Sequence, residues 1–253
     1  MTVNGLATQR LEALCLDLLT RFDDTEGLQR TSVPALFSER TGSFKGVGFT
    51  LTTQAFRSDE IKRLVFARIV DDEGSTRSVT VIGFPTDTSA LPILGVDMIA
   101  FGRALSLVAL DYAPTNATYW RDVAEPVLAR LGAQAFERLK RRKRPEFTRG
   151  SFSEAAIIAA SPPGTEGAAC DAAKALVARY LEMPTRGDSY PSAPADQSVE
   201  HWCAAELGNR KEHDALAGIF GESFAEAYLG FLFGGDERPH TMVTRSTGGE
   251  CHV

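Results

Sequence analysis

The sequence lacks the short motifs that mark several common enzyme classes. It has no Gly-x-Gly-x-x-Gly after a predicted strand, no phosphate-binding P-loop, and neither an HExxH nor a GxSxG motif. Its four cysteines form no CxxC pair, and all four histidines lie in the last quarter of the chain. Nucleotide, flavin and metal sites are therefore not expected. Any chemistry must use carboxyls, hydroxyls and arginines on a bound molecule that carries its own reactivity.

Long hydrophobic runs and an excess of positive charge are also missing. No apolar run approaches the roughly 20 residues that cross a membrane, and the N-terminus lacks a basic region followed by an apolar stretch. The formal net charge of -6 argues against a protein that coats nucleic acid or a membrane through its overall charge. We therefore expect a soluble, cytoplasmic, monomeric protein whose 253 residues form one domain.

The hydrophobic periodicity predicts a helix, then a sheet, then more helices. Leu11, Leu14 and Leu18 recur at helical spacing within an N-terminal helical region of about 1–41. Between 42 and 114 the pattern changes to short apolar or alternating runs separated by turn residues. Because most connections are too short for the crossovers of parallel strands, we predict an antiparallel meander.

Helical patterns return after this sheet. They predict helices over about 116–141, 166–182 and 210–232, with one more strand over 152–161. The Pro- and Ser-rich stretch 183–198 is predicted as a loop, and 234–253 as a mobile tail of the same domain. The expected fold class is therefore α/β, with a central antiparallel sheet and helices before and after it.

An acid interrupts an apolar run in the middle of the predicted sheet. Asp97 lies within LPILGVDMIAFG, whose residue types favour an extended chain. A carboxylate there must find a partner, keep its proton or meet a ligand. The ordinary interpretation of an Asp in a strand is a carboxylate satisfied by a turn or an arginine, so the residues alone leave both a structural and a functional role open.

Three stretches of the sequence resemble the ferredoxin-dependent bilin reductases. Residues 78–115 read SVTVIGFPTDTSALPILGVDMIAFGRALSLVALDYAPT, with that family's strand ending in Phe-Pro, its Leu-Pro-x-x-Gly-x-Asp strand and a strand ending in an acid before Pro. Residues 152–163, FSEAAIIAASPP, are similar to the strand after the family's central helix, and 209–233 resemble its last helix. The resemblance covers most of 42–233.

This resemblance implies a fold and a reaction. The family has one three-layer α/β/α sandwich domain with a central antiparallel sheet, and it holds biliverdin between the sheet and the C-terminal helices. It reduces this linear tetrapyrrole with electrons taken one at a time from reduced 2Fe-2S ferredoxin and binds no metal or flavin itself. The expected partners are therefore biliverdin and ferredoxin, with heme oxygenase upstream, no nucleic acid and no membrane.

The resemblance places Asp97 at the family's proton-donating aspartate. We expect the neighbouring apolar residues to raise its pKa by desolvation; these neighbours are Ile93, Leu94, Val96 and Met98. Phe84, in the Phe-Pro strand end, is expected at the substrate. Ser106 aligns with a residue that helps to hold a bilin propionate, although an ordinary strand serine is as good an interpretation. Asp111 is expected to cap or orient a strand end.

Two positions depart from the family pattern. Thr80 stands where members that reduce the outer vinyl group have a catalytic histidine, and a hydroxyl does not shuttle protons at neutral pH as imidazole does. Arg210, next to Asn209, replaces an acid of several members and could clamp a propionate, since Ala160 occupies the position of a propionate-binding arginine. Asp214 either substitutes for the missing acid or pairs with Arg210, and we favour the pairing. Thr80, Asn209, Arg210 and Asp214 are all expected at the bilin.

A basic run reverses the charge of this acidic chain locally. It consists of Lys140, Arg141, Arg142, Lys143 and Arg144. Charge runs are most often solvated loop edges, and nucleic acid is disfavoured because no recognition helix or aromatic-rich pattern accompanies the run. Ferredoxins are acidic, so beside a bilin pocket the run is predicted to dock ferredoxin.

The sequence thus predicts a ferredoxin-dependent reductase of biliverdin IXα in which Asp97 supplies protons. Because Asp97 is the one evident donor, we expect a two-electron reduction to 15,16-dihydrobiliverdin, with the four-electron product phycocyanobilin as the rival. The competing hypothesis is a non-catalytic bilin or heme carrier that has kept the fold, which the residues at positions 80 and 210 keep open.

Overall fold

A computed structural model describes residues 6–183 and 195–234, and its centre is one antiparallel sheet. Strands form where β-branched and aromatic residues alternate with polar ones. Their bounds are β1 (Gln29–Thr31), β2 (Glu39–Phe44), β3 (Val47–Arg57), β4 (Ile61–Asp71), β5 (Thr76–Pro85), β6 (Ile93–Phe101), β7 (Ala104–Ala113), β8 (Lys140–Arg141) and β9 (Ile157–Ser161). The order is β1-β3-β4-β5-β6-β7-β9-β8, and β2 pairs with β3 off this path. The predicted meander over β3 to β7 is confirmed.

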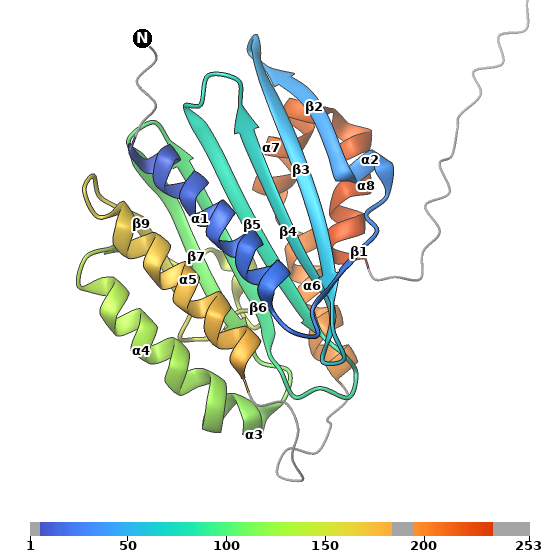
Figure 1. Ribbon diagram of the computed structural model, residues 1–253, viewed down its shortest axis with the longest axis vertical. Helices are drawn as coiled ribbons and strands as arrows, with labels where there is room; N and C mark the ends of the chain where they lie inside the picture. Colours follow the sequence, from blue (N-terminus) through green and yellow to red (C-terminus); the bar gives the residue numbers. More distant parts are fainter. Residues whose placement is uncertain (1–5, 184–194, 235–253) are drawn as a thin grey trace, which may run out of the picture.

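Helices cover both faces of the sheet, which confirms the three-layer α/β/α sandwich (Figure 1). The bounds of the α-helices are α1 (Leu6–Asp24), α2 (Ala35–Ser38), α3 (Ala117–Tyr119), α4 (Glu125–Phe136), α5 (Glu166–Glu182), α6 (Ala195–Leu207), α7 (Arg210–Phe220) and α8 (Glu222–Phe233). A π-helical turn, η1 (Trp120–Ala124), joins α3 to α4, and a 3-10 turn, η2 (Glu146–Thr148), follows β8. The helices α1, α4 and α5 lie on one face, and α6, α7 and α8 on the other.

Each face of the sheet packs against its helices through a separate hydrophobic core, because successive side chains of a strand point to opposite faces. On one face Val96 of β6 shares a core with Leu14 of α1 and Leu176 of α5. On the other face Ile93 of β6 shares a core with Trp202 of α6. Fully burying a side chain of this size contributes roughly 1.5–3 kcal/mol, so both cores hold the helix layers in place.

Several boundaries differ from the sequence expectation. The single helix expected over 210–232 is two helices, α7 and α8, joined at Gly221, whose φ of 94° no helix interior adopts. The helix α6 starts inside the stretch predicted as a loop, and most of that stretch, 184–194, lies outside the described residues. The N-terminal helical region also contributes β1 and the start of β2 to the sheet. The predicted tail, apart from Gly234, likewise lies outside the described residues.

No helix within the described ranges is long and apolar enough to cross a membrane.

Candidate active site

Asp97 lies in the middle of β6, on the sheet face that α6 and α7 cover. It pairs with Thr80 of β5 and Ala109 of β7. Strand alternation gives it the same face as Ile93, whereas three of the expected apolar neighbours point to the opposite core; these are Leu94, Val96 and Met98. The expectation that these three surround the carboxyl is therefore wrong, because adjacent positions of a strand do not share a face.

The carboxyl of Asp97 is desolvated by the helix layer above it rather than by its sequence neighbours. Burial raises its pKa to about 6, and a hydrogen bond from Thr80 opposes that rise. In this bond the Thr80 hydroxyl donates to Asp97 Oδ1 at 3.2 Å. Thr80, which stands where some members of the similar family have a histidine, thus contacts the acid directly.

The sheet surface around Asp97 is less covered than the core on either side of it. Thr80, Gly95, Asp97, Ile99 and Ala109 are half-buried, in contrast to the fully buried side chains nearer to α8. Three of these five residues, Thr80, Gly95 and Ala109, have small side chains.

The helix α6 brings a second carboxyl to this surface. Trp202 lies over Gly95, where a Cβ would meet its ring at 4.0 Å, and Glu206 is one turn further along α6. Only 6% of Glu206 is exposed, and its Oε1 has no hydrogen-bond partner among the described residues. Its pKa is raised to about 9, first by burial and then by the charges of Glu212 and Asp97.

A third carboxyl comes from α7. Burial, followed by the charge of Asp97, raises the pKa of Glu212 to about 8, while a hydrogen bond from the Asn209 amide opposes the rise. That amide nitrogen lies 3.4 Å from Glu212 Oε2. Asp97, Glu206 and Glu212 therefore form one electrostatically coupled acid cluster, drawn from β6, α6 and α7. Within the described residues none of the three has an ion pair with a basic side chain.

Sequence reasoning missed Glu206 and Glu212. The family pattern places an acid near the start of the last helix, and Asp214 was the expected substitute for it in this chain. The helix that carries Glu206 was not predicted at all, so no spacing rule connected this residue with the sheet. The signal that could have found both is their position: each lies within a few residues of Asn209, at the junction of two helices.

Arg210 and Asp214 form the favoured pair at the surface. Their side chains are 81% and 65% exposed, and Nη2 of the arginine lies 3.7 Å from Oδ1 of the aspartate. Two such exposed groups are weakly coupled in water. Asp214 is thus directed to solvent, and the carboxyls near Asp97 are those of the buried Glu206 and the half-buried Glu212.

Phe84 and Ser106 lie in more ordinary settings. Phe84 is buried and packs edge-on against Trp202, with ring centroids 5.8 Å apart. Ser106 occupies an irregularity in the pairing of β6 with β7, and its hydroxyl donates to the Ile99 carbonyl at 3.1 Å. Phe84 supports the helix layer over the site, whereas the Ser106 hydroxyl is already engaged with the backbone.

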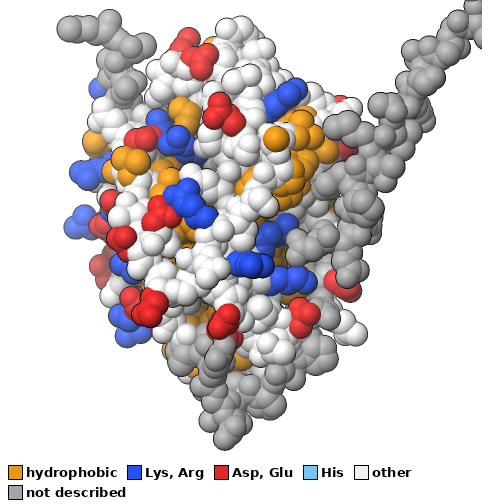
Figure 2. Space-filling model, turned by 45° about the vertical axis from the view of Figure 1, so that its right-hand side comes forward, with side chains coloured by type: hydrophobic (Ala, Val, Ile, Leu, Met, Phe, Trp, Pro, Cys, Tyr) orange, Lys and Arg blue, Asp and Glu red, His pale blue; other side chains and the backbone are white. Residues whose placement is uncertain are grey.

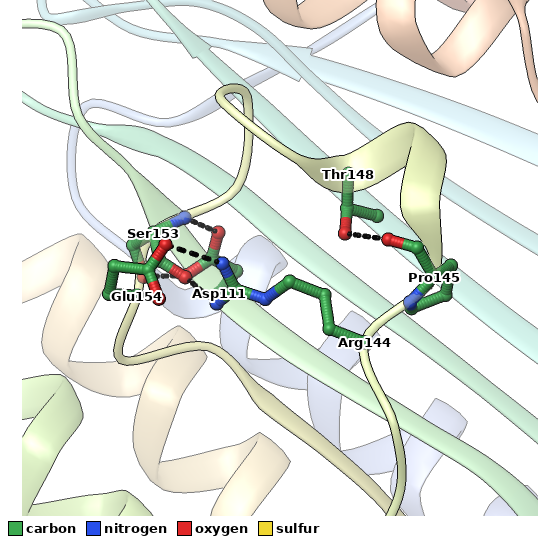
Figure 3. A network of polar contacts seen from close by, with 6 residues as sticks. All are labelled: Asp111, Arg144, Pro145, Thr148, Ser153 and Glu154. Carbon is green, nitrogen blue, oxygen red and sulfur yellow. Dashed lines mark hydrogen bonds and ion pairs between the residues drawn. The ribbon is translucent and has the colours of Figure 1, made fainter.

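Asp111 has a structural role at the end of β7. Its carboxylate accepts hydrogen bonds from the backbone N–H and the hydroxyl of Ser153, which ties β7 to the loop before β9 (Figure 3). Burial raises its pKa to about 7, against the effect of these hydrogen bonds. Arg144 donates to the Ser153 carbonyl and pairs with Glu154 at 3.1 Å. This arginine of the basic run is therefore part of the same network.

The rest of the basic run lies at the far edge of the sheet. Lys140 and Arg141 form the edge strand β8, and the Arg141 guanidinium lies 3.7 Å from the ring centroid of Phe136. Lys140, Arg142 and Lys143 are exposed, and no ion pair links them to an acid within the described ranges. These three form the part of the run that is available to a partner.

Two other features lie away from Asp97. A cavity of about 620 Å³ opens between α1, α4 and α5, on the opposite side of the sheet, and is lined by side chains such as Arg10, Gln134 and Asp171. Among the described residues, His213, Glu222 and Glu226 bring ligand-type atoms within 4.8 Å of one another at the α7–α8 junction. The His213 ring already pairs with Glu222 at 3.5 Å, and both glutamates are exposed.

Comparison with known proteins gives consistent matches. The family model described as ferredoxin-dependent bilin reductase matches residues 16–234. The chain is similar to a phycocyanobilin:ferredoxin oxidoreductase of Prochlorococcus marinus, with 27% identity over 188 residues and 70% of each chain covered. It is also similar to a 15,16-dihydrobiliverdin:ferredoxin oxidoreductase of Gloeobacter violaceus, with 29% identity over 104 residues and 41% of each chain covered. The crystal structure of tomato phytochromobilin synthase in complex with biliverdin superimposes with a TM-score of 0.69 at 16% identity, covering 89% of this chain and 82% of that one.

Proposed function

This chain belongs to the ferredoxin-dependent bilin reductase family, and on that premise we propose that it reduces biliverdin with electrons from a reduced 2Fe-2S ferredoxin. The observation that carries the proposal is the half-buried Asp97, which has a raised pKa and lies on a less covered part of the sheet. A conjugated tetrapyrrole can hold an unpaired electron, so the protein must deliver protons and exclude side reactions. A desolvated acid beneath two helices meets both requirements.

The proton balance of the reaction defines what the site must do. Reducing one double bond of the bilin to a single bond takes two electrons, which arrive singly from two ferredoxin molecules, and two protons. Asp97 gives a proton to the singly reduced bilin and is protonated again from solvent. The Thr80 hydroxyl orients the Asp97 carboxyl by a hydrogen bond, and the side-chain amide of Asn209 orients the Glu212 carboxyl by another. The hydrophobic core between the sheet and α6, which includes Phe84 and Trp202, limits the access of oxygen and water to the bilin radical.

The carboxylates of the bilin side chains need partners at the rim of the site. Arg210 is exposed and bound only weakly to Asp214, so its guanidinium is free to turn toward a propionate. Ser106 would first have to release the Ile99 carbonyl. We therefore assign the propionate contact to Arg210 before Ser106.

The product depends on how many protons the site supplies. The expectation of 15,16-dihydrobiliverdin rested on Asp97 as the one evident donor. Glu206 and Glu212 remove that premise, because both acids lie near Asp97 and hold protons at neutral pH. Phycocyanobilin, the four-electron product, is therefore an equal candidate.

Ferredoxin is assigned to the edge of the sheet near β8. Lys140, Arg142 and Lys143 offer exposed positive charge there, which suits an acidic partner. Arg141 and Arg144 stabilise this edge rather than contact the partner, because each already has an intramolecular partner.

The proposal is tested by anaerobic turnover. The purified protein is mixed with biliverdin and a chemically reduced 2Fe-2S ferredoxin, and the pigments are separated by chromatography. Consumption of biliverdin and formation of a reduced bilin are expected. Stoichiometric binding of biliverdin with full recovery of the unchanged pigment would contradict the proposal and support a bilin carrier.

A further inference from the structure

Glu206 differs from the other buried acids of this protein. Both carboxylate oxygens of Glu166 accept hydrogen bonds from the Gly164 N–H, and the carboxylate of Asp71 accepts bonds from the N–H and hydroxyl of Ser75. These two acids therefore have structural roles. Glu206 is equally inaccessible, yet one of its oxygens has no partner among the described residues. A buried polar atom without a partner destabilises the fold, so its retention indicates another role.

The surroundings of Glu206 keep its proton in place. Asp97 of β6 and Glu212 of α7 face it with negative charge, and Cys203, one turn earlier on α6, is coupled to it. Glu146 of η2 and Arg149, the residue after η2, pair with each other at 3.0 Å on the surface. Arg63 of β4, whose charge acts on Cys203, donates to the carbonyls of Phe231 and Leu232, and no basic side chain within the described residues forms an ion pair with Asp97, Glu206 or Glu212. Carboxyls that share a dry site do not all ionise together.

The distribution of protons over the cluster favours Glu206 as a source. At neutral pH Asp97, with a pKa of about 6, is largely ionised while the site is empty. Glu206, with a pKa of about 9, is largely protonated. Glu212, with a pKa of about 8, also holds a proton before the substrate arrives, but Asn209 donates a hydrogen bond to it, whereas Glu206 Oε1 has no partner among the described residues.

We propose that Glu206 is the second proton donor of this site, so that the two protons taken up by one double bond come from Asp97 and from Glu206. This inference rests on the proposed function. Asp97, which is largely ionised in the empty site, first takes up a proton from solvent, and two electrons from reduced ferredoxin with the protons of Asp97 and Glu206 then convert one C=C bond of the bilin into CH–CH. Each donor is left as a carboxylate and is protonated again from solvent. Its position on α6, one turn after Trp202, directs Glu206 toward the helix-facing side of a ligand that lies on β5 and β6.

The test compares Glu206→Gln with two matched variants. Glutamine is isosteric with the protonated acid but has no proton to give, Glu206→Asp keeps an acid, and Glu200→Gln makes the same chemical change at an exposed position of α6. Each protein is loaded with biliverdin and given reduced ferredoxin under anaerobic conditions. Absorbance, electron paramagnetic resonance and chromatography then follow the bilin.

We expect Glu206→Gln to bind biliverdin as tightly as the wild type and to slow turnover by about a hundredfold, with accumulation of a radical that has taken up one proton. Glu206→Asp should recover at least about a tenth of the wild-type rate, and Glu200→Gln should not differ from the wild type. In the wild type the rate should fall at high pH, as Glu206 loses its proton.

A structural role for Glu206 predicts different results. In that case Glu206→Gln would change biliverdin affinity or stability but leave the turnover of the bound pigment within about twofold of the wild type, and that rate would overturn the inference. If the wild type itself formed no reduced bilin, the proposed function would be wrong and this inference would fall with it.

Discussion

At the scale of single residues, the pKa of Asp97 depends on its burial and on the hydrogen bond that its carboxyl accepts. Thr80 donates to its carboxylate, and this bond lowers a pKa that burial raises. A family pattern that places histidine at this position would put a second titrating group there, whereas threonine tunes the aspartate without exchanging protons itself. Within the described part of the chain, the groups whose pKa responds to the charge of Asp97 are the carboxyls of Glu206 and Glu212.

Thr80→Val tests this tuning. Valine is nearly isosteric with threonine but cannot donate, so the ionised form of Asp97 loses a hydrogen bond and its pKa should rise by about half a unit to one unit. The pH at which the Asp97 carboxyl titrates, measured by infrared difference spectroscopy, should shift upward. Ser78 lies two residues before Thr80 in β5 and therefore on the same face, and Ser78→Ala should leave that pH unchanged. An unshifted titration in Thr80→Val would show that the hydrogen bond does not form in solution.

The sequence predicted Asp97 correctly as an acid on the central sheet but misjudged its surroundings. The Leu-Pro-x-x-Gly-x-Asp motif identifies Asp97 and the strand that carries it, because a residue and its strand are local properties of the sequence. It does not say which neighbours share a face until the alternation of side chains is applied, and that rule excludes Leu94, Val96 and Met98. Glu206 and Glu212 could not be linked to Asp97 from the sequence, because their contact depends on how two helices pack over the sheet.

At the scale of secondary structure elements, the break between α7 and α8 shapes the helix layer over the site. The sequence suggested one continuous helix, because apolar residues recur through the junction. Gly221 ends α7 with a φ of 94° and a ψ of 153°, a conformation that residues with a Cβ rarely adopt. The turn lets α7 pack on β2, which positions the start of α7, with Glu212, near Asp97.

Gly221→Ala should therefore be destabilising. No atom lies within 4 Å of the Cβ that would be added, so the effect comes from backbone strain, on the order of 1–3 kcal/mol. Gly230→Ala, inside α8 and equally free of contacts, should instead be neutral or stabilising by up to about 1 kcal/mol. Urea denaturation of the two variants measures the difference. Equal stabilities for the two would mean that the junction relaxes into a continuous helix.

At the scale of the whole molecule, charge distribution sets how a partner approaches. The net charge is -6, and on the face that Figure 2 shows, basic and acidic side chains are interspersed. The three exposed basic residues near β8 lie at the opposite edge of the sheet from β1. An acidic protein would be steered to this edge, and steering of this kind weakens with salt.

A triple variant tests this docking surface. Replacing Lys140, Arg142 and Lys143 with glutamine should raise the KM for ferredoxin by about tenfold at low ionic strength and flatten its dependence on salt, with biliverdin affinity unchanged. A control triple variant at Lys45, Arg57 and Lys62 removes the same charge from exposed positions on the other half of the sheet. If the two triple variants behaved alike, only net charge would matter and the edge near β8 would have no special role.

The most direct test of the account is a single-turnover comparison of Asp97→Asn with the wild type. Asparagine keeps the size of the side chain and removes the proton, so the variant should bind biliverdin but reduce it at least about a hundredfold more slowly, with a radical that persists in the electron paramagnetic resonance spectrum. Asp87→Asn, at an exposed loop position, should match the wild type. Formation of the reduced bilin by Asp97→Asn at the wild-type rate would contradict the assignment of this sheet surface as the active site.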